Sequence, residues 1–347
     1  MRKLYTLLLV IGLLALAVVP AAAQDDPTIA DLVVSSSEAE EAEFTVLLAA
    51  VQAADPVFLE LLSDSDEALT VFAPTDAAFG ELLDALGMTA EELLAETDLL
   101  NEVLAYHVVP TALYAEDVVA VDGAYIGTFL EGKAVSVSVE DDSVFIDDSE
   151  VVSADVEAAN GVVHVIDSVL LPAEVEDEEM LEMMETMEEA QEEPTMSITE
   201  IVADSASAEE AEFTVLLAAV QAADPAVLEA LSEGGPYTVF APTDAAFAAA
   251  LEALDMTAEE LLADTELLTE ILAYHVVLGS FSTLDLGIII EMAGMDADMP
   301  SFATTLPGTF ISLTDVGVNE VGVIGFDIMA TNGVVHVIDG VLLPPEE

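Results

Sequence analysis

The chain has 347 residues, no cysteine, and 70 acidic against 3 basic residues, for a formal net charge of −67. The missing cysteines exclude disulfides, thiol catalysis and zinc–thiolate sites, and the charge disfavours binding to nucleic acid or anionic lipid. The length suggests about two domains, each large enough to bury its own core.

The first 23 residues have the three parts of a secretory signal peptide. Arg2 and Lys3 precede an apolar stretch that runs from Leu4 to Val19, and small residues follow at 21–23. The stretch is short for a membrane span and has the wrong flanks. We therefore expect an exported protein, secreted or periplasmic and associated with the cell surface, whose mature form has no membrane span. After cleavage, Lys133 is the one basic side chain left.

Five sequence blocks occur twice, in the same order, with an offset of 168 to 172 residues between the copies. A period of this length indicates a duplicated domain and is far too long for a solenoid. We predict one domain over residues 25–173, a linker rich in Glu and Met over 174–194, and a second domain over 195–347. The blocks begin at Phe44, Thr70, Met88, Leu104 and Asn160, and again at Phe213, Thr238, Met256, Leu272 and Asn332.

The first half of each copy has the periodicity of helices. Residues 44–51 and 79–86 place apolar side chains at i, i+3, i+4 and i+7. The decapeptide TVFAPTDAAF, residues 70–79, predicts a strand that turns into a helix, with Thr75 or Asp76 capping the free amides. Thr89 and Glu92 have the spacing of a capping box. Helix capping thus explains the polar atoms of the decapeptide.

The second half of each copy has the pattern of strands. Residues 134–148 alternate apolar and polar side chains about an acidic turn, which predicts a hairpin. Residues 161–171 form a nearly continuous apolar run that predicts a buried strand. The second copy diverges at 286–295, an apolar run too short to span a bilayer. Each copy is therefore predicted to be α+β, with helices first and a sheet afterwards.

The repeated blocks resemble the fasciclin-like domain family. Three motifs characterise this family: a TVFAPT segment, a Tyr-His pair in the middle of the domain, and a closing segment. The closing segment reads DIMATNGVVHVIDGVLLP at 327–344 and DVEAANGVVHVIDSVLLP at 155–172. The resemblance implies two tandem fasciclin-like domains, each a wedge of β-sandwich with an N-terminal helical half. It also implies a secreted, non-enzymatic adhesion protein of the extracellular matrix type.

The resemblance further implies which residues meet a partner. Integrin recognition in animal members has been attributed to the Tyr-His and Asp-Ile segments, although nothing here indicates an animal host. What carries over is a general binding surface for an extracellular protein or an envelope polysaccharide. No catalytic residue, cofactor or metal is expected. The implied partner-binding residues are Tyr106, His107, Asp155, Val156, Tyr274, His275, Asp327 and Ile328.

Each residue of the repeated motifs has a structural interpretation as well as a functional one. All four histidines, His107, His164, His275 and His336, lie in repeated blocks, which invites a metal or general-base role. With no H-E-x-x-H motif and no converging ligands, we favour packed, hydrogen-bonded rings. For the two tyrosines we favour core aromatics with satisfied hydroxyls over direct partner contact. The Asn-Gly pairs at 160–161 and 332–333 predict turns with positive φ.

The acidic composition leaves two further questions open. The turns at 140–142 and 147–150 lack the spacing of a calcium loop, so we favour solvated turns with at most a weak cation association. The overall charge has two interpretations. It is an adaptation to a salty or acidic habitat, which would relieve the repulsion between carboxylates, or it serves solubility alone. A melting temperature that changes with neither salt concentration nor pH would exclude the habitat hypothesis.

Two functions therefore remain. The first is a secreted, non-enzymatic protein that acts through surface contacts. The alternative is an extracellular carrier of a small apolar ligand, a lipid or a pigment, which the high aliphatic content permits. An exposed Tyr-His edge without a cavity would favour the first, and a deep apolar pocket would favour the second. An enzyme ranks third, because no nucleophile, phosphate or dinucleotide motif is present.

Overall fold

The computed structural model describes residues 27–37, 43–65, 68–140, 143–172, 194–207, 211–293, 300–314 and 317–345. The predicted signal peptide, all but the last residue of the predicted linker, and positions 141–142 of the first acidic turn lie outside these ranges. We call the described parts 27–172 and 194–345 the first and second repeat.

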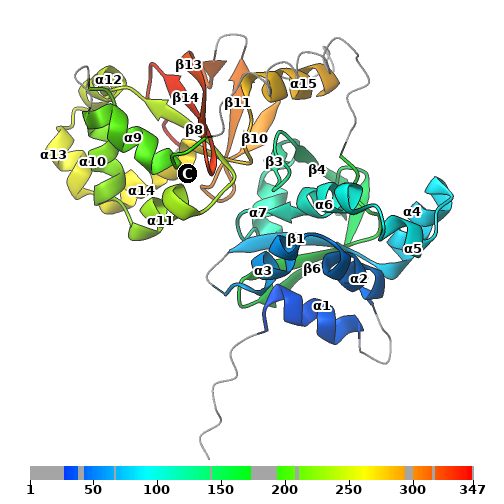
Figure 1. Ribbon diagram of the computed structural model, residues 1–347. Helices are drawn as coiled ribbons and strands as arrows, with labels where there is room; N and C mark the ends of the chain where they lie inside the picture. The colour runs from blue at the N-terminus through cyan, green and yellow to red at the C-terminus, as the bar shows by residue number, and fades with distance from the viewer. Residues whose placement is uncertain are drawn as a thin grey trace, which may run out of the picture.

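Both repeats place their helices before most of their strands, as the periodicity predicts (Figure 1). The helices of the first repeat are α1 (Ile29–Ser37), α2 (Thr45–Ala53), α3 (Pro56–Ser63), α4 (Asp76–Leu86), α5 (Ala90–Leu93), α6 (Thr97–Tyr106) and α7 (Ala115–Ala120). Those of the second are α9 (Ile198–Ser207), α10 (Thr214–Ala222), α11 (Pro225–Glu233), α12 (Asp244–Leu254), α13 (Ala258–Ala263), α14 (Thr265–Tyr274) and α15 (Thr283–Ala293).

Equivalent strands occur in both repeats. The first repeat holds β1 (Leu69–Pro74), β2 (Val108–Val109), β3 (Tyr125–Gly127), β4 (Ala134–Glu140), β5 (Ser143–Ile146), β6 (Ser149–Ala158) and β7 (Gly161–Ile166). The second holds β8 (Tyr237–Pro242), β9 (Val276–Leu278), β10 (Ser301–Ala303), β11 (Phe310–Thr314), β12 (Gly317–Val318), β13 (Val321–Ala330) and β14 (Gly333–Ile338). The α+β class and the tandem arrangement are confirmed.

The strands join in the order β2-β1-β7-β6-β5-β4-β3-β10-β11-β12-β13-β14-β8-β9. The second half of this order repeats the first half in reverse, so the equivalent strands β3 and β10 meet in the middle. Inside each repeat the decapeptide strand runs parallel to the closing strand, β1 beside β7 and β8 beside β14. The duplicated blocks therefore form the three strands at the outer end of each half.

A seam between β3 and β10 connects the two repeats (Figure 1). Tyr125 pairs with Phe302 across it, and their rings lie 5.8 Å apart. The backbone N–H of Gly132 donates to the carbonyl of Ser280 at 2.8 Å. None of these positions lies in a repeated block, so the seam has no signature in the sequence.

Capping, which the sequence predicts for the polar side chains of the decapeptide, is confirmed for Thr75, whereas Thr70 bonds the loop at Thr111 and Leu113. Thr75 caps α4 by accepting from the N–H of Ala78. The carboxylate of Asp76 has a different use, because it accepts from the N–H of Val46 and the hydroxyl of Thr45 at the start of α2. The capping box of Thr89 and Glu92 is confirmed, as is its counterpart in the second repeat.

The predicted Asn-Gly turns are also confirmed, and Gly161 and Gly333 have φ values of 138° and 145°. The structure adds a role for the asparagine. Asn160 is fully buried, accepts from the N–H of Ile29 at 2.8 Å, and donates to the carbonyl of Leu62 at 3.0 Å. One amide thus connects the sheet to α1 and to the end of α3.

Two details differ from the sequence expectation. The apolar run at 286–295 lies mostly in helix α15, because Asp285 and Asp327 supply acceptors for its first amides. The predicted strand at 161–171 ends at Ile166, where the chain turns toward the ring of His107. Hydropathy alone does not distinguish these outcomes, because both runs are mostly apolar.

Candidate partner-binding site

The Tyr-His pairs lie inside the protein, at the ends of α6 and α14. Tyr106 and Tyr274 are 4% and 5% exposed, and both histidines are buried. The hydroxyl of Tyr106 lies 3.0 Å from the carbonyl oxygen of Ala134, and that of Tyr274 lies 3.1 Å from its counterpart, the carbonyl oxygen of Phe310. The favoured reading, core aromatics with satisfied hydroxyls, agrees with this geometry.

His107 connects two backbone segments through its two ring nitrogens. Nδ1 lies 2.6 Å from the carbonyl of Val103, and Nε2 accepts from the N–H of Leu170 at 2.9 Å. The partners require a neutral ring with its proton on Nδ1. Burial lowers the pKa of His107 to about 4, although the bond to Val103 opposes this shift. Neither nitrogen is available to a substrate or metal.

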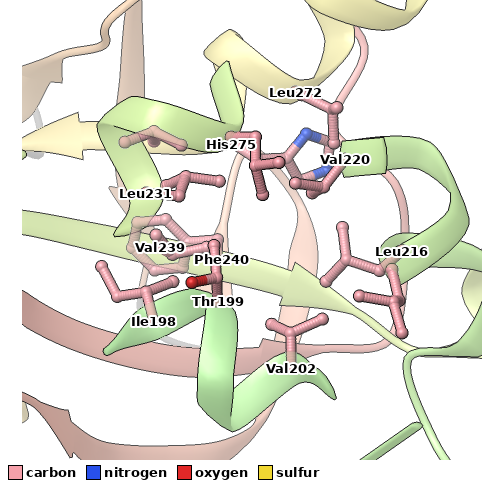
Figure 2. A pocket seen from close by; sticks show the side chains of 13 residues that line it. Ile198, Thr199, Val202, Leu216, Val220, Leu231, Val239, Phe240, Leu272 and His275 are labelled. Carbon is pink, nitrogen blue, oxygen red and sulfur yellow. The ribbon is translucent and has the colours of Figure 1, made fainter. Parts of the chain in front are cut away.

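The second repeat reproduces this connection at His275. Nδ1 lies 2.7 Å from the carbonyl of Ile271, and Nε2 accepts from the N–H of Leu342 at 2.9 Å. Burial lowers the pKa of His275 to about 4 as well. Figure 2 shows the ring among the apolar side chains of α9, α10 and β8. The cavity beside it measures about 30 Å³, which suffices for one or two water molecules and no larger ligand.

His164 and His336 have the opposite tautomer. Nε2 of His164 lies 2.8 Å from the carbonyl of Leu113, and Nδ1 accepts from the N–H of Asp155 at 3.3 Å. His336 repeats both contacts with Phe281 and Asp327. The packed, hydrogen-bonded histidines expected from the sequence are therefore present at all four positions. Among the described residues, no group of three or more His, Asp and Glu side chains could hold a metal ion.

Asp155 and Asp327 lie at bulges in β6 and β13 and adopt positive φ values of 56° and 54°. Asp155 accepts from the N–H of Ala115, the first residue of α7, at 2.8 Å. Asp327 accepts from the N–H and the hydroxyl of Thr283, the first residue of α15. Each carboxylate therefore holds a helix N-terminus against the sheet.

Replacing Asp155 with alanine should destabilise the first repeat by about 2 kcal/mol, because the change removes a cap and strains a left-handed backbone. Asp155→Asn should recover most of the loss, since asparagine keeps the acceptor and tolerates positive φ. Urea denaturation of the two variants measures both effects. Equal stability of Asp155→Ala and the wild type would refute the capping role.

The hydrophobic residues that follow these aspartates are only partly accessible. Val156 and Ile328 are half-buried and pack against the cores. The assignment of the eight residues of the Tyr-His and Asp-Ile segments to partner binding stays a prediction. The hydrogen bonds that the structure gives these residues lie within the chain, and Asp155 is the one exposed residue among the eight.

An exposed apolar strip lies beside Asp327 on β13. Ile324 and Phe326 are each 57% exposed and lie two positions apart on β13, where the register with β14 shifts. The equivalent positions in β6 hold the exposed residues Val152 and Ala154. Sequence reasoning missed the strip because alternation does not reveal which face of a strand is covered.

The first repeat also contains an apolar cavity of about 300 Å³. It lies between α2, α4 and α6, and its polar lining residues are Glu102 and His107. Exposed leucines at positions 86, 99 and 171 line it where it meets the surface. Its volume is at the lower end of the range for small-molecule sites.

No single described helix is long and apolar enough to cross a bilayer. The pairs α2–α3 and α10–α11 pass this test only in combination, and each pair is bent by 119°. Residues of all four helices belong to the hydrophobic cores or pack against them, which accounts for their apolar character.

Comparison with known proteins identifies both repeats. The model of the Fasciclin domain matches residues 42–172 and 211–344. Protein sll1483 of Synechocystis sp. is 45% identical over 37% of this chain and 67% of its own length. Human periostin is 28% identical over 81% of this chain, which spans only 28% of periostin. A solved FAS1 domain pair from the insect cell adhesion molecule fasciclin I aligns over 86% of this chain and 95% of its own, with 16% identity and a TM-score of 0.33.

Proposed function

Because the chain belongs to the fasciclin domain family, we propose that it is an exported, non-enzymatic protein that binds a partner at the cell surface. The observation that supports this proposal most directly is the exposed strip of Ile324 and Phe326, which borders the family's Asp-Ile segment. Large apolar side chains at 57% exposure, two positions apart on one strand, are a feature of interaction sites. The buried Tyr-His pair and the half-buried Asp327 of the second repeat then position the strip without contacting the partner.

The charge of the chain indicates the class of partner. With 70 acidic residues against 3 basic ones, the surroundings of any apolar patch are acidic. A complementary partner has an apolar centre bordered by basic side chains, so we favour an extracellular protein over an envelope polysaccharide. Association with such a partner should weaken as salt is added, because salt screens the rim charges.

Binding of the full chain to cell-envelope fractions tests the proposal. Ile324→Ser combined with Phe326→Ser should weaken retention by about tenfold, because the central anchors of an interface carry most of its energy. Val57→Ser is the matched control, since Val57 is 56% exposed on α3, away from the strip. Unchanged retention of the folded double variant would exclude the strip.

The tyrosines need a separate experiment. We expect Tyr106→Phe and Tyr274→Phe together to leave envelope binding unchanged, because both hydroxyls bond within the protein. Phenylalanine keeps the ring packing, so the fold survives and only the hydroxyls are removed. If this folded double variant lost binding, the hydroxyls would be assigned to the partner after all.

The cavity in the first repeat favours a second candidate, a carrier of a small apolar ligand. Its lining is apolar apart from Glu102 and His107, and Figure 1 shows α2, α4 and α6 in the same lobe. The acidic surface would repel an anionic amphiphile, so the expected ligand is neutral. This function does not exclude the first, because the cavity and the strip lie in different repeats.

A neutral fluorescent probe, phenylnaphthylamine, tests the carrier function. We expect it to bind the full chain, and we expect Leu82→Trp to block binding by filling the cavity. Ala250→Trp is the matched control, because it occupies the same position in the second repeat. The anionic probe anilinonaphthalene sulfonate should bind more weakly. Equal probe binding by Leu82→Trp and the wild type would reject the cavity as the site.

A further inference from the structure

Asp147 and Asn319 occupy the same place in the two repeats but differ chemically. Asp147 follows β5 and Asn319 follows β12, with φ values of 52° and 46°. Oδ1 of each accepts from a backbone N–H at 2.8 Å, that of Ser136 or of Ser312. The other terminal atom of each side chain reaches the hydroxyl of the buried tyrosine. One repeat thus has a carboxyl where the other has an amide.

In the second repeat, the donor and the acceptor of each hydrogen bond at this tyrosine can be assigned. The amide Nδ2 of Asn319 donates to the hydroxyl oxygen of Tyr274 at 2.9 Å. The hydroxyl of Tyr274 donates its single proton to the carbonyl of Phe310 at 3.1 Å. The hydroxyl of Tyr274 thus accepts one hydrogen bond, from Asn319, and donates one, to Phe310.

The first repeat has the same distances but lacks a donor if Asp147 is ionised. The hydroxyl oxygen of Tyr106 lies 3.0 Å from Oδ2 of Asp147 and also 3.0 Å from the carbonyl oxygen of Ala134. One hydroxyl proton would then serve two acceptors. A proton on Oδ2 removes this conflict, because Asp147 donates to Tyr106 and Tyr106 donates to Ala134, as in the second repeat.

We propose that Asp147 carries this proton in the folded chain, at pH values where exposed aspartates are ionised. Oδ1 remains the acceptor for the N–H and the hydroxyl of Ser136, at 2.8 and 3.1 Å. The first repeat therefore contains a neutral carboxyl, a proton-binding site that the second repeat replaces with an amide.

The charges around the site support this assignment. Burial raises the pKa of Asp147, and the neighbouring Asp148 adds to the rise, whereas the hydrogen bonds from Ser136 and Tyr106 oppose it. The titratable groups that face it are Tyr106 from α6, Tyr125 from β3 and Asp148 from its own turn. Burial raises the pKa of both tyrosines above the usual value, so each stays neutral.

The proton lies close to the seam between the two repeats. Asp147 bonds Ser136, Ser136 pairs with Tyr125 in β3, and Tyr125 pairs with Phe302 in β10. A carboxyl whose pKa is raised on folding stabilises the fold below its unfolded pKa, and this contribution is lost as pH rises through the folded pKa. The site thus makes the first repeat and its seam more stable in acid than in base.

Carbon-13 NMR of the side-chain carboxyls in the full chain tests the proposal directly. The resonance that disappears in Asp147→Asn belongs to Asp147. We expect its titration midpoint to lie above those of the exposed aspartates in the same spectra. A midpoint at or below theirs would mean that Asp147 is an ordinary carboxylate and would overturn the proposal.

Exchanging the two residues provides a second test by thermal unfolding. Asp147→Asn should melt about 3 °C higher than the wild type at alkaline pH, with a smaller gain in acid. Asn319→Asp should introduce the same pH dependence into the second repeat. The proposal fails if Asp147→Asn melts at or below the wild-type temperature at every pH, because the amide would then be the poorer partner for Tyr106.

Discussion

Replacing Gly127 with alanine is expected to open the seam between the two fasciclin domains. A Cβ atom at Gly127 would lie 1.8 Å from the carbonyl oxygen of Leu278 and 2.7 Å from the Cα of Gly279, both of them backbone atoms of the second domain. Real Cβ contacts are never this short, so β3 must move away from the end of β9, and we expect this shift to separate β3 from its partner β10 as well. The pairing of Tyr125 with Phe302 would then be lost.

Small-angle scattering of the full chain measures this effect as an increase in the radius of gyration. Both domains should keep their own secondary structure, because each has its own helices and its strands pair mostly with strands of the same domain. Gly80→Ala is the matched control, since a Cβ there meets nothing within 4 Å and the residue lies inside helix α4. An unchanged radius for Gly127→Ala would show that the domains do not depend on this seam.

The second large effect is expected for His107→Phe. Phenylalanine fills the space of the ring but offers neither nitrogen, so the buried N–H of Leu170 loses its acceptor. The carbonyl of Val103 loses its side-chain partner as well. Unsatisfied buried groups of this kind cost about 1–3 kcal/mol each, so the first domain should lose about 3 kcal/mol.

Chemical denaturation measures this loss of stability. The equivalent histidine of the second domain, His275, provides the control. His275→Phe should lower the stability of the second domain by a similar amount, because its ring bonds Ile271 and Leu342 in the same way. A folded His107→Phe variant with an unchanged denaturation midpoint would contradict the structural role of the ring.

Local features of the fold could be predicted from the sequence because their partners are near in the chain. The capping box at Thr89 and the Asn-Gly turn at 160–161 depend on residues within three positions. The sequence predicts a capping role for Asp76 close to its own position, but its carboxylate accepts from an amide 30 positions away in α2. The favoured reading of the histidines was correct about packing, but it did not identify the partners Val103 and Leu170.

Contacts between distant segments could not be predicted. The seam pairs Tyr125 with Phe302, and neither residue belongs to a repeated block, so no internal symmetry pointed to it. The exposure of Ile324 and Phe326 depends on which face of β13 the rest of the chain covers, and an apolar pattern is the same for either face. The contrast between Asp147 and Asn319 becomes visible only once their tyrosine partners are located.

The central claim is that the signature residues of this duplicated chain build its framework. Nitrogen-15 NMR of the histidine rings tests it most directly, because tautomer and titration are read from the same signals. The account predicts that His107 and His275 are neutral, protonated on Nδ1, and have pKa values of about 4. If His107 or His275 titrated at the ordinary pKa of 6.5, or carried its proton on Nε2, the account would be contradicted.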